Sequence, residues 1–430
     1  MNHDFSSDSG FLAAQTGWHP SSDLDAGILS SASAVTSTVD TSRIGSLGPE
    51  VGRKVTDICN SLLNVFNDRE KYAKFLQHRG EAAEDLLDIL QKLLDHAPLM
   101  PQFRAILYVA LVRLCRKSEL CPRSFKLEGV TDKGDDARWS GRFGDVFQAR
   151  YNGSLVCLKS VKVFQERDSA EAFNERRKNA YKALSREAVV WGQLSHENIL
   201  PFYGIYFFGN TLCLVSPLME NGTIHEFLRD KPTANRPHLI HGVAAGMEYL
   251  HRNGVVHGDL KCNNVLVAEP EKALLTDFGF SYVTDMIGSR FRGPAFSSNQ
   301  ASGGFFLAPE LIQDSTKRRD EASDVFAFGI LCYEMFLSPE SPRLVDVIYS
   351  KIVHSSQLPE RPNINVSRGL TDNMWALMKR CWSLEHRPTA KEIKQGFPWS
   401  SGRDRISIRP GFERVNDATI TNANNRLRAL

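Results

Sequence analysis

The sequence predicts an α+β fold of two lobes, a small β-rich lobe with one main helix and a large helical lobe, preceded by a small helical segment. Three observations support this prediction. Short runs with strand composition, such as LVCLKSVKV and TLCLVSPLM, follow residue 121, and a long helical stretch around 170–194 interrupts them. From about residue 222 onward the apolar residues recur mainly with a helical period. A small sheet with one helix and then a larger helical part form two packed units.

Residues 1–50 have the composition of a disordered tail. They are rich in Ser, Thr, Ala, Gly and Asp, and their few large apolar residues show no period. Burial in such a segment cannot offset the entropy that is lost on ordering. At the other end of the chain, residues 398–430 are polar and are predicted to be a flexible tail.

Residues 51–121 are predicted to form a helical module of about three helices. In EAAEDLLDILQKLLD and FRAILYVALVRLCRK the apolar residues recur at i, i+3 and i+4. The segment HAPLMP separates these two helices, because proline removes a backbone donor and clashes with the preceding turn. An earlier helix is expected near ICNSLLNVFNDREKYAKFL. The apolar stripes either pack on each other and on the next domain, or bind a partner protein.

Composition and charge argue against several classes of protein. Hydrophobic residues make up 42% and charged residues 24% of the 430 residues, as in ordinary soluble domains. A net charge of +2 does not indicate nucleic-acid binding, and no apolar run is long enough to span a membrane. The eight cysteines are dispersed without a CxxC pair, so we expect free thiols in a reducing compartment, the cytoplasm or alternatively the nucleus.

One stretch beginning at His257, HGDLKCNNVLVAEPEKALLTDFG, carries the residues that phosphoryl transfer needs. That reaction requires held phosphates, a placed divalent metal and an oriented acceptor hydroxyl. Asp259 is the candidate base that accepts and orients the hydroxyl, and Lys261 can reach the transferred phosphate. Asn264 and Asp277 supply the hard oxygen ligands that Mg²⁺ prefers.

This stretch resembles the catalytic loop and the metal-binding motif of eukaryotic protein kinases, and the resemblance extends over residues 127–397. It implies a kinase fold, ATP as the phosphate donor and a protein as the acceptor. Lys159 in VCLK resembles the lysine that pairs with the α- and β-phosphates, and Glu187 resembles the helix glutamate that holds this lysine. Glu171 and Glu175 lie nearer in sequence, but Glu187 leads directly into AVVWGQLSHENILPFYG, which is similar to the helix exit of the family.

Further matches to the family follow in its order. Asp277-Phe278-Gly279 and Ala308-Pro309-Glu310 resemble the two ends of an activation segment. Asp324 resembles the aspartate that braces the catalytic loop, and Arg387 resembles the arginine that pairs with Glu310.

The nucleotide-binding residues that the resemblance implies include one departure. The family pattern GxGxxGxV is matched in WSGRFGDVF by Gly141, Gly144 and Val146, whereas Trp139 replaces the first glycine. The other residues expected around adenine are Cys157, Ser216 as gatekeeper, the Pro217 carbonyl, the Met219 amide and carbonyl, and Leu266 as the apolar floor.

Lys261 resembles the lysine that serine/threonine kinases have at this position. The segments MENGTIHEFL, LTDNMWALMKRCW and RPTA resemble those of the tyrosine-kinase-like branch of these kinases. The preceding helical segment is similar to one that accompanies such kinases in fungi. The activation segment departs from the usual pattern, because Ser302-Gly303 and Phe306 stand where Gly-Thr and Trp are expected. Dual specificity therefore stays open.

Gly258 stands where the family usually has an arginine that pairs with a phosphate on the activation segment. We expect an activity that does not depend on a phosphate docked there; alternatively, the glycine only eases a tight turn. The main prediction is an active, ATP- and Mg²⁺-dependent serine/threonine kinase in signalling. Its helical module would regulate it, dock a partner or support the small lobe. The alternative is a pseudokinase scaffold that signals through protein–protein interaction.

Overall fold

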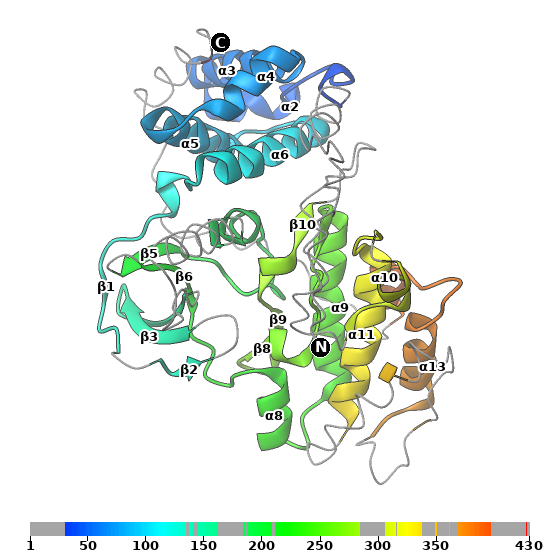
Figure 1. Ribbon diagram of the computed structural model, residues 1–430. Helices are drawn as coiled ribbons and strands as arrows, with labels where there is room; N and C mark the ends of the chain where they lie inside the picture. The colour runs from blue at the N-terminus through cyan, green and yellow to red at the C-terminus, as the bar shows by residue number, and fades with distance from the viewer. Residues whose placement is uncertain are drawn as a thin grey trace, which may run out of the picture.

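The computed structural model describes residues 31–134, 137–140, 145–160, 184–185, 187–208, 211–283, 306–314, 316–337, 349–350, 361, 369–396 and 427. In Figure 1 a group of helices lies above a small β-rich lobe, and a larger helical lobe lies beside that sheet. The predicted α+β architecture of two lobes preceded by a helical segment is confirmed.

The helical segment before the lobes contains four consecutive long helices. They are α3 (Pro49–Phe66), α4 (Arg69–Gln77), α5 (Gly80–His96) and α6 (Pro101–Ser118). As predicted, the proline-containing segment separates α5 from α6. The single earlier helix of the prediction is divided in two, because the side chain of Asp68 accepts hydrogen bonds from the backbone N–H groups of Glu70 and Lys71 and so begins α4.

Part of the segment that composition predicts to be disordered packs on these helices instead. Residues 1–30 lie outside the described residues. The short elements α2 (Thr41–Ile44) and η1 (Gly45–Leu47) precede α3. The Asp40 N–H group donates to the Pro98 carbonyl at 2.7 Å, and the Met100 N–H group donates to the Thr38 carbonyl at 3.1 Å. This segment finds backbone partners in the α5–α6 connection, and an apolar pattern does not reveal such partners.

The small lobe is built on an antiparallel sheet of order β1-β3-β4-β6-β5, with β2 paired to β3. The strands are β1 (Val130–Thr131), β2 (Trp139–Ser140), β3 (Asp145–Tyr151), β4 (Ser154–Ser160), β5 (Gly204–Phe208) and β6 (Thr211–Pro217). Along β4, Val156 and Leu158 are buried in an apolar cluster on one face. Because side chains alternate along a strand, Cys157 and Lys159 project from the opposite face, where the candidate site lies.

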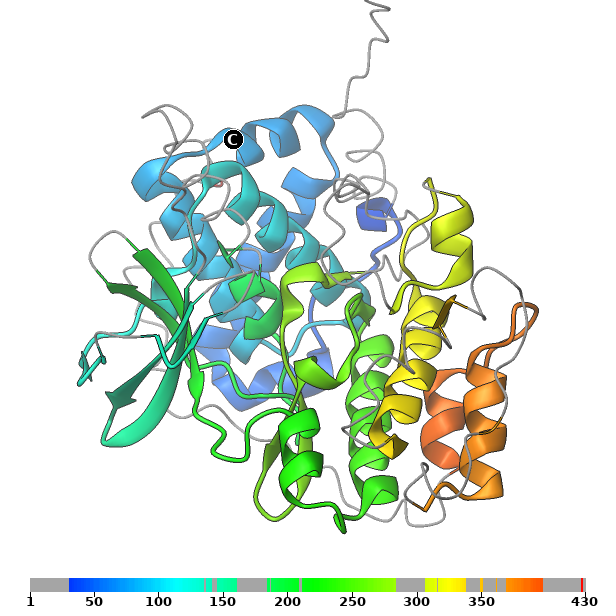
Figure 2. The same cartoon turned by 60° about the horizontal axis from the view of Figure 1, so that its bottom comes forward.

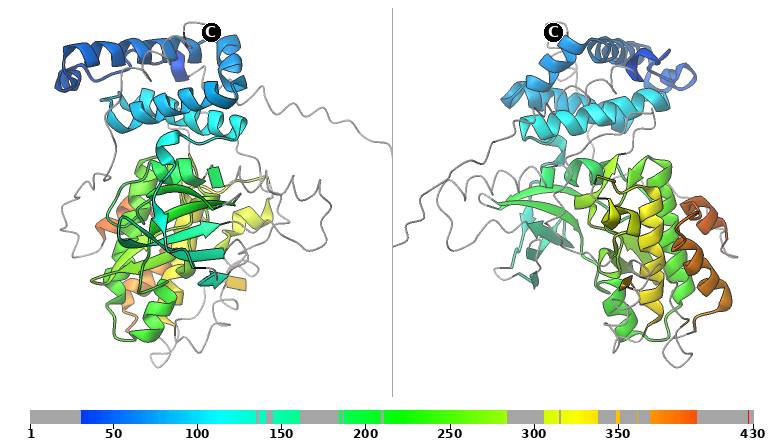
Figure 3. Two further views of the ribbon diagram at one scale, coloured as in Figure 1. Left: turned by 90° about the vertical axis from the view of Figure 1, so that its left-hand side faces the viewer. Right: turned by 45° about the vertical axis from the view of Figure 1, so that its right-hand side comes forward.

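The large lobe is mainly helical, with α11 packed between α9 and α13. Figure 2 and the right-hand panel of Figure 3 show this packing beside the sheet of the small lobe. Its helices are α8 (Ile224–Asp230), α9 (Arg236–Arg252), α10 (Pro309–Gln313), α11 (Glu321–Phe336), α13 (Asp372–Cys381) and α14 (Ala390–Gln395). Short elements near the site are β7 (Val255–Val256), η3 (Cys262–Asn264), β8 (Val265–Ala268), β9 (Lys272–Leu275), η4 (Phe278–Phe280) and β10 (Tyr282–Val283).

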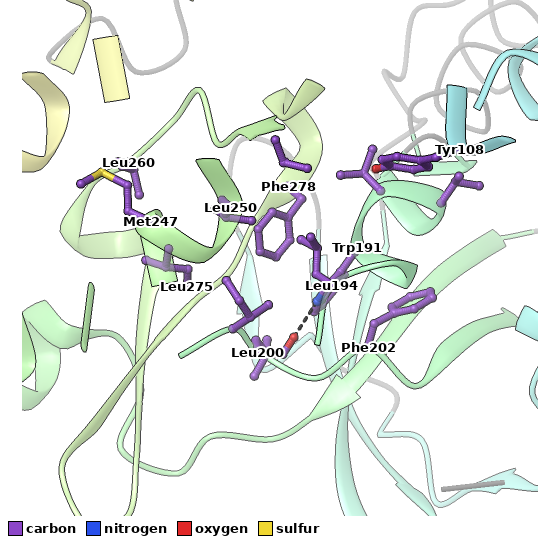
Figure 4. Close-up of a cluster of buried hydrophobic side chains, with 14 of the residues drawn as sticks. Tyr108, Trp191, Leu194, Leu200, Phe202, Met247, Leu250, Leu260, Leu275 and Phe278 are labelled. Carbon is purple, nitrogen blue, oxygen red and sulfur yellow. Dashed lines mark hydrogen bonds between the residues drawn. The ribbon is translucent and has the colours of Figure 1, made fainter. Parts of the chain in front are cut away.

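A continuous apolar core joins the first helices to both lobes. We call residues 184–192 the Glu187 helix; all of them except residue 186 are described. Buried side chains of α5 and α6 belong to the same cluster as those of this helix and of α9 and α11. Figure 4 shows Tyr108 of α6 in this cluster together with Trp191 of the Glu187 helix and Phe278. The helices before the lobes therefore share a core with the rest of the molecule.

Candidate active site

Lys159 lies between two carboxylates that come from distant parts of the chain. Its Nζ donates to Glu187 Oε1 at 2.8 Å and to Asp277 Oδ1 at 2.9 Å. Burial opposes the charge on the lysine, but Asp277 and Glu187 raise its pKa above the ordinary value. Burial raises the pKa of Glu187. Burial also acts to raise the pKa of Asp277, but the charge and hydrogen bond of Lys159, together with the charge of Lys261, lower that pKa below its ordinary value. The lysine therefore stays a cation beside an ionised Asp277.

The candidate base Asp259 is buried and is held by its own loop. Lys261 Nζ donates to Asp259 Oδ2 at 2.6 Å. The side-chain amide of Asn264 donates to the Asp259 carbonyl at 2.7 Å and to Asp259 Oδ2 at 2.9 Å. These donors fix the direction in which the carboxylate points, which a general base needs.

The β8–β9 hairpin places Asn264 and Asp277 at the same end. Val265 pairs with Leu275 in the register, and the Thr276 N–H group donates to the Asn264 carbonyl at 3.0 Å. Because the amide nitrogen of Asn264 donates to Asp259, its side-chain oxygen is the atom suited to a metal. An amide oxygen and a carboxylate fit a divalent cation whose other ligands are phosphate oxygens and water. The described residues contain no group of three or more His, Cys, Asp or Glu that could hold a metal ion.

His257 links the catalytic loop to the start of the Asp277 motif. Its Nδ1 accepts from the Asp259 N–H group at 3.2 Å, and its Nε2 lies 3.0 Å from the Thr276 carbonyl. This pattern requires the proton on Nε2. The ring centroid of His257 lies 5.4 Å from that of Phe278, which lies 5.8 Å from that of Trp191. These rings connect the catalytic loop to the Glu187 helix.

Asp324 of α11 braces the loop from below, as the resemblance implies. Its two carboxylate oxygens accept from the backbone N–H groups of His257 and Gly258, each at 2.8 Å, and Oδ2 lies 3.0 Å from His251 Nε2. Burial acts to raise the pKa of Asp324, but the hydrogen bonds lower it below the ordinary value. Gly258 has a φ of +78°, a left-handed conformation that favours glycine.

The residues expected around the nucleotide lie on β3, β4, β6 and β8. Val146 pairs with Lys159, and Cys157 pairs with the buried Ser216. Pro217 ends β6, and the carbonyl of Met219 accepts from the Gly222 N–H group at 3.1 Å. Leu266 is half-buried on β8. Gly141 and Gly144 lie outside the described residues, as do residues 284–305 of the activation segment.

The end of the activation segment is fixed by the ion pair that the resemblance implies. The guanidinium of Arg387 donates to Glu310 Oε1 at 2.5 Å and to Glu310 Oε2 at 2.9 Å. Burial acts to raise the pKa of Glu310, but the hydrogen bond and charge of Arg387, together with a backbone hydrogen bond, keep that pKa below its ordinary value. Phe306, which stands where a Trp is expected, lines a small hollow with Gly258, Asp259 and Asp324.

Sequence reasoning missed several residues that position the site. The sequence pattern indicates neither the role of His251 nor the contact between Trp191 and Phe278. One feature of the sequence could have indicated His251: it lies in the last turn of α9, five residues before Val256, which lies just ahead of the catalytic loop and pairs with Tyr282. Spacing alone does not say that its ring reaches Asp324.

Comparisons with known proteins agree with this geometry. The profile of the family described as protein tyrosine and serine/threonine kinase matches residues 139–397. The chain is 28% identical over 67% of its length to a probable serine/threonine-protein kinase, kinX, of Dictyostelium discoideum. It is 29% identical over 59% to the serine/threonine-protein kinase STY17 of Arabidopsis thaliana, and 26% identical over 63% to the kinase suppressor of Ras 2 of Homo sapiens.

These matches cover 25%, 42% and 28% of the respective relatives, so the chain spans less than half the length of each. The family match, by contrast, covers more than half of the chain and contains Lys159, Glu187, Asp259, Asn264 and Asp277. The chain belongs to the protein tyrosine and serine/threonine kinase family.

Proposed function

We propose that the protein transfers the γ-phosphate of ATP, with Mg²⁺, to serine or threonine hydroxyls of a protein substrate in signalling. The observation that carries this proposal is the double hydrogen bond of Lys159 to Glu187 and Asp277, with Asp259 held by Lys261 and Asn264. These two groups contain the lysines and carboxylates that phosphoryl transfer uses.

Each side chain has one task in this proposal. Asp259 orients the acceptor hydroxyl and takes its proton. The hydroxyl oxygen of the substrate then bonds to the γ-phosphorus, and the bond between the γ-phosphorus and the β-phosphate oxygen breaks. Lys159 holds the α- and β-phosphates, and Lys261 offsets the charge on the transferred group. Asn264 and Asp277 would hold Mg²⁺, which supplies a Lewis acid for the phosphate oxygens.

The adenine would lie between the sheet and β8. Val146 and Cys157 contribute apolar surface from above, and Leu266 contributes it from below. Ser216, the Pro217 carbonyl and the Met219 backbone would face its edge, and the backbone of Gly141 and Gly144 would approach the phosphates. Burial raises the pKa of Cys157 to about 11, so its thiol stays neutral there and serves as a small apolar contact.

The proposed kinase domain extends over residues 127–397, with a helical module at 51–121. No helix in the described part of the chain combines the length and the hydropathy that crossing a membrane requires. We place the protein in the cytoplasm, with the nucleus as the alternative. The seven buried cysteines among the eight described, all unpaired, are compatible with a reducing compartment.

The test is phosphate transfer from γ-labelled ATP with Mg²⁺, to the protein itself and to a generic basic protein, followed by phosphoamino-acid analysis. Label on serine or threonine that disappears in Lys159→Met is the expected result. Label on tyrosine as well would establish dual specificity. A folded protein that transfers no label under any metal condition would overturn the proposal and favour a scaffold.

A further inference from the structure

The Glu187 helix, together with the residue that follows it, contacts both Lys159 and the helices α5 and α6. Glu187 itself bonds to Lys159. Its neighbours Ser185, Gly192 and Gln193 contact residues between 91 and 125. We propose that residues 49–125, here named the positioning module, hold this helix in place, and that Phe125 and Gln91 are positioning residues for phosphoryl transfer. The inference rests on the proposed kinase function.

The first contact is between Phe125 and Gly192. Phe125 is fully buried in the turn η2 (Arg123–Phe125), and its ring meets the Phe202 ring edge-on with centroids 5.6 Å apart. A Cβ atom on Gly192 would lie only 2.6 Å from Phe125 Cζ. The ring therefore lies directly on the backbone of the Glu187 helix. The thickness of the ring sets how closely that helix approaches the module.

The second contact is a hydrogen bond between two glutamines. Gln193 Nε2 donates to Gln91 Oε1 at 2.8 Å. Gln91 is completely buried on α5, and its own Nε2 donates to Asp95 Oδ1 at 2.9 Å. With its amide nitrogen engaged in this way, Gln91 presents its oxygen to the end of the Glu187 helix. Loss of this partner would leave a buried amide oxygen without a hydrogen bond, which costs free energy. The contact therefore resists separation of the two segments.

The third contact lies on the other side of Glu187. The thiols of Cys115 and Cys121 both donate toward the Ser185 carbonyl, at 3.8 and 4.0 Å. Thiols are weak donors, so these contacts mainly report close packing of α6 and the following segment on the helix. Contacts at Ser185 and at Gly192 bracket Glu187, which restrains both shift and rotation of the helix.

The segment that carries Phe125 is itself anchored on two sides. The Arg123 N–H group donates to Asp88 Oδ1 at 2.6 Å, and Arg123 Nε lies 3.3 Å from Glu84 Oε2. On the other side, the Leu127 N–H group donates to the Ile205 carbonyl of β5 at 2.8 Å. Phe125 therefore cannot move without α5 or the sheet. Phe125 thus couples the position of the module to the position of the Glu187 helix.

This arrangement distinguishes the alternatives that the sequence leaves open for the helical module. A separate docking domain would have no reason to bury Gln91 and Phe125 against the Glu187 helix. A module that only supported the sheet would contact β5 and leave Glu187 unaffected. The contacts instead connect the module to the residue that orients Lys159, and they give its helices a direct effect on the reaction.

The test is a pair of compensating substitutions in the full chain. Gly192→Ala inserts a methyl group against Phe125 and displaces the helix. It is expected to lower kcat/KM for ATP about tenfold or more, since displacements near 1 Å can cost 10²-fold. Adding Phe125→Leu removes ring atoms and should restore activity to within about threefold of the parent.

Phe66→Leu is the matched control for Phe125→Leu. Phe66 is equally buried, but its ring contacts Tyr72 and Phe75 within the module. Added to Gly192→Ala, it should restore nothing. A merely structural role for Phe125 would make the two Phe→Leu substitutions equivalent. Equal behaviour, or an effect of Gly192→Ala that Phe125→Leu leaves unchanged, would overturn the inference.

Hydrogen exchange provides a readout that does not need phosphate transfer. Amides of residues 187–192 should exchange about tenfold faster in Gly192→Ala and should recover in the Gly192→Ala, Phe125→Leu double variant. If the parent protein transfers no phosphate, the proposed function fails, and exchange still decides the inference. Should Gly192→Ala not fold, Gln91→Ala serves instead. Unchanged exchange at residues 187–192 in Gln91→Ala would then overturn the inference.

Discussion

Lys159 donates a 2.8 Å hydrogen bond to Glu187, a residue 28 positions later in the chain. Two other glutamates, Glu171 and Glu175, stand nearer in sequence. The pair forms because β4 directs Lys159 away from the apolar cluster of the sheet, toward the Glu187 helix. Burial makes this contact consequential, since a lysine and a carboxylate in low dielectric lose much free energy when separated.

The first prediction concerns this pair. Glu187→Gln keeps the shape of the side chain and removes its charge, so Lys159 is held less firmly. A charged hydrogen bond of this kind is worth ~1.5–3 kcal/mol, which corresponds to a fall in kcat/KM of about ten- to a hundredfold. Steady-state kinetics with varied ATP measure it. Glu171→Gln and Glu175→Gln are the controls; a comparable loss in either, with Glu187→Gln unaffected, would reject the assignment.

The second prediction uses two neighbouring asparagines. Asn264 is buried with its amide on Asp259, whereas Asn263 is exposed. Asn264→Ala removes the proposed metal-binding oxygen and should raise the Mg²⁺ concentration required for half-maximal activity by about tenfold or more. Asn263→Ala should leave it unchanged. Initial rates measured over a range of Mg²⁺ concentrations check this prediction. Identical curves for the two variants would contradict the assignment of Asn264 as a metal ligand.

The third prediction concerns Asp324 and pH. Because its pKa is lowered in the folded state, its contribution to stability is present above its ordinary pKa of 3.8 and is lost as the pH falls through the folded value. Asp324→Asn leaves one of two backbone N–H groups without an acceptor. We expect a loss of about 3 kcal/mol in the free energy of unfolding at pH 7.

Urea unfolding at several pH values measures this loss. The difference between the parent and Asp324→Asn should persist down to about pH 4 and shrink below it. The exposed Asp132, which lies 3.7 Å from Arg150, provides the control. Asp132→Asn should change the free energy of unfolding by less than about 1 kcal/mol at any pH. A pH-independent difference for Asp324→Asn would contradict the account.

The fourth prediction follows from Gly258. This residue has no side chain to pair with a phosphate, and its N–H group is already bonded to Asp324. Replacing Ser289, Ser297, Ser298 and Ser302 together by alanine should therefore keep the rate of phosphate transfer within about threefold of the parent. Assays on a generic substrate check this. A large loss that phosphomimetic residues restore would show that a phosphate elsewhere on the segment controls activity.

Much of the site could be predicted from sequence because its residues act through short, fixed spacings. Asp259, Lys261 and Asn264 lie on one loop, and a two-stranded hairpin connects that loop to Asp277. The Glu310–Arg387 and Asp324 contacts followed from matching motifs in order. Within the catalytic loop, local geometry and residue chemistry specify the partner, whereas the Glu310–Arg387 and Asp324 contacts are long-range and are implied by the family resemblance.

Other features depend on contacts that a linear pattern does not contain. Apolar stripes on α5 and α6 predict burial but do not identify the Glu187 helix as the covering surface. The sequence pattern predicts that Gln91 is an ordinary exposed polar residue of a helix, although it is buried and hydrogen-bonded to Gln193. The division between α3 and α4 depends on one side-chain cap at Asp68. The packing of residues 38–47 depends on backbone pairing, which composition does not encode.

The most direct test of the central claim compares the parent protein with Asp259→Asn in single-turnover phosphate transfer and in ATP binding. Loss of the base should lower the rate by about 10³-fold, within the range for general-base groups, while ATP affinity stays within about threefold. That separation would establish a kinase whose catalytic loop acts as proposed. A fall of less than about tenfold in the rate, or a parallel loss of ATP affinity, would contradict the account.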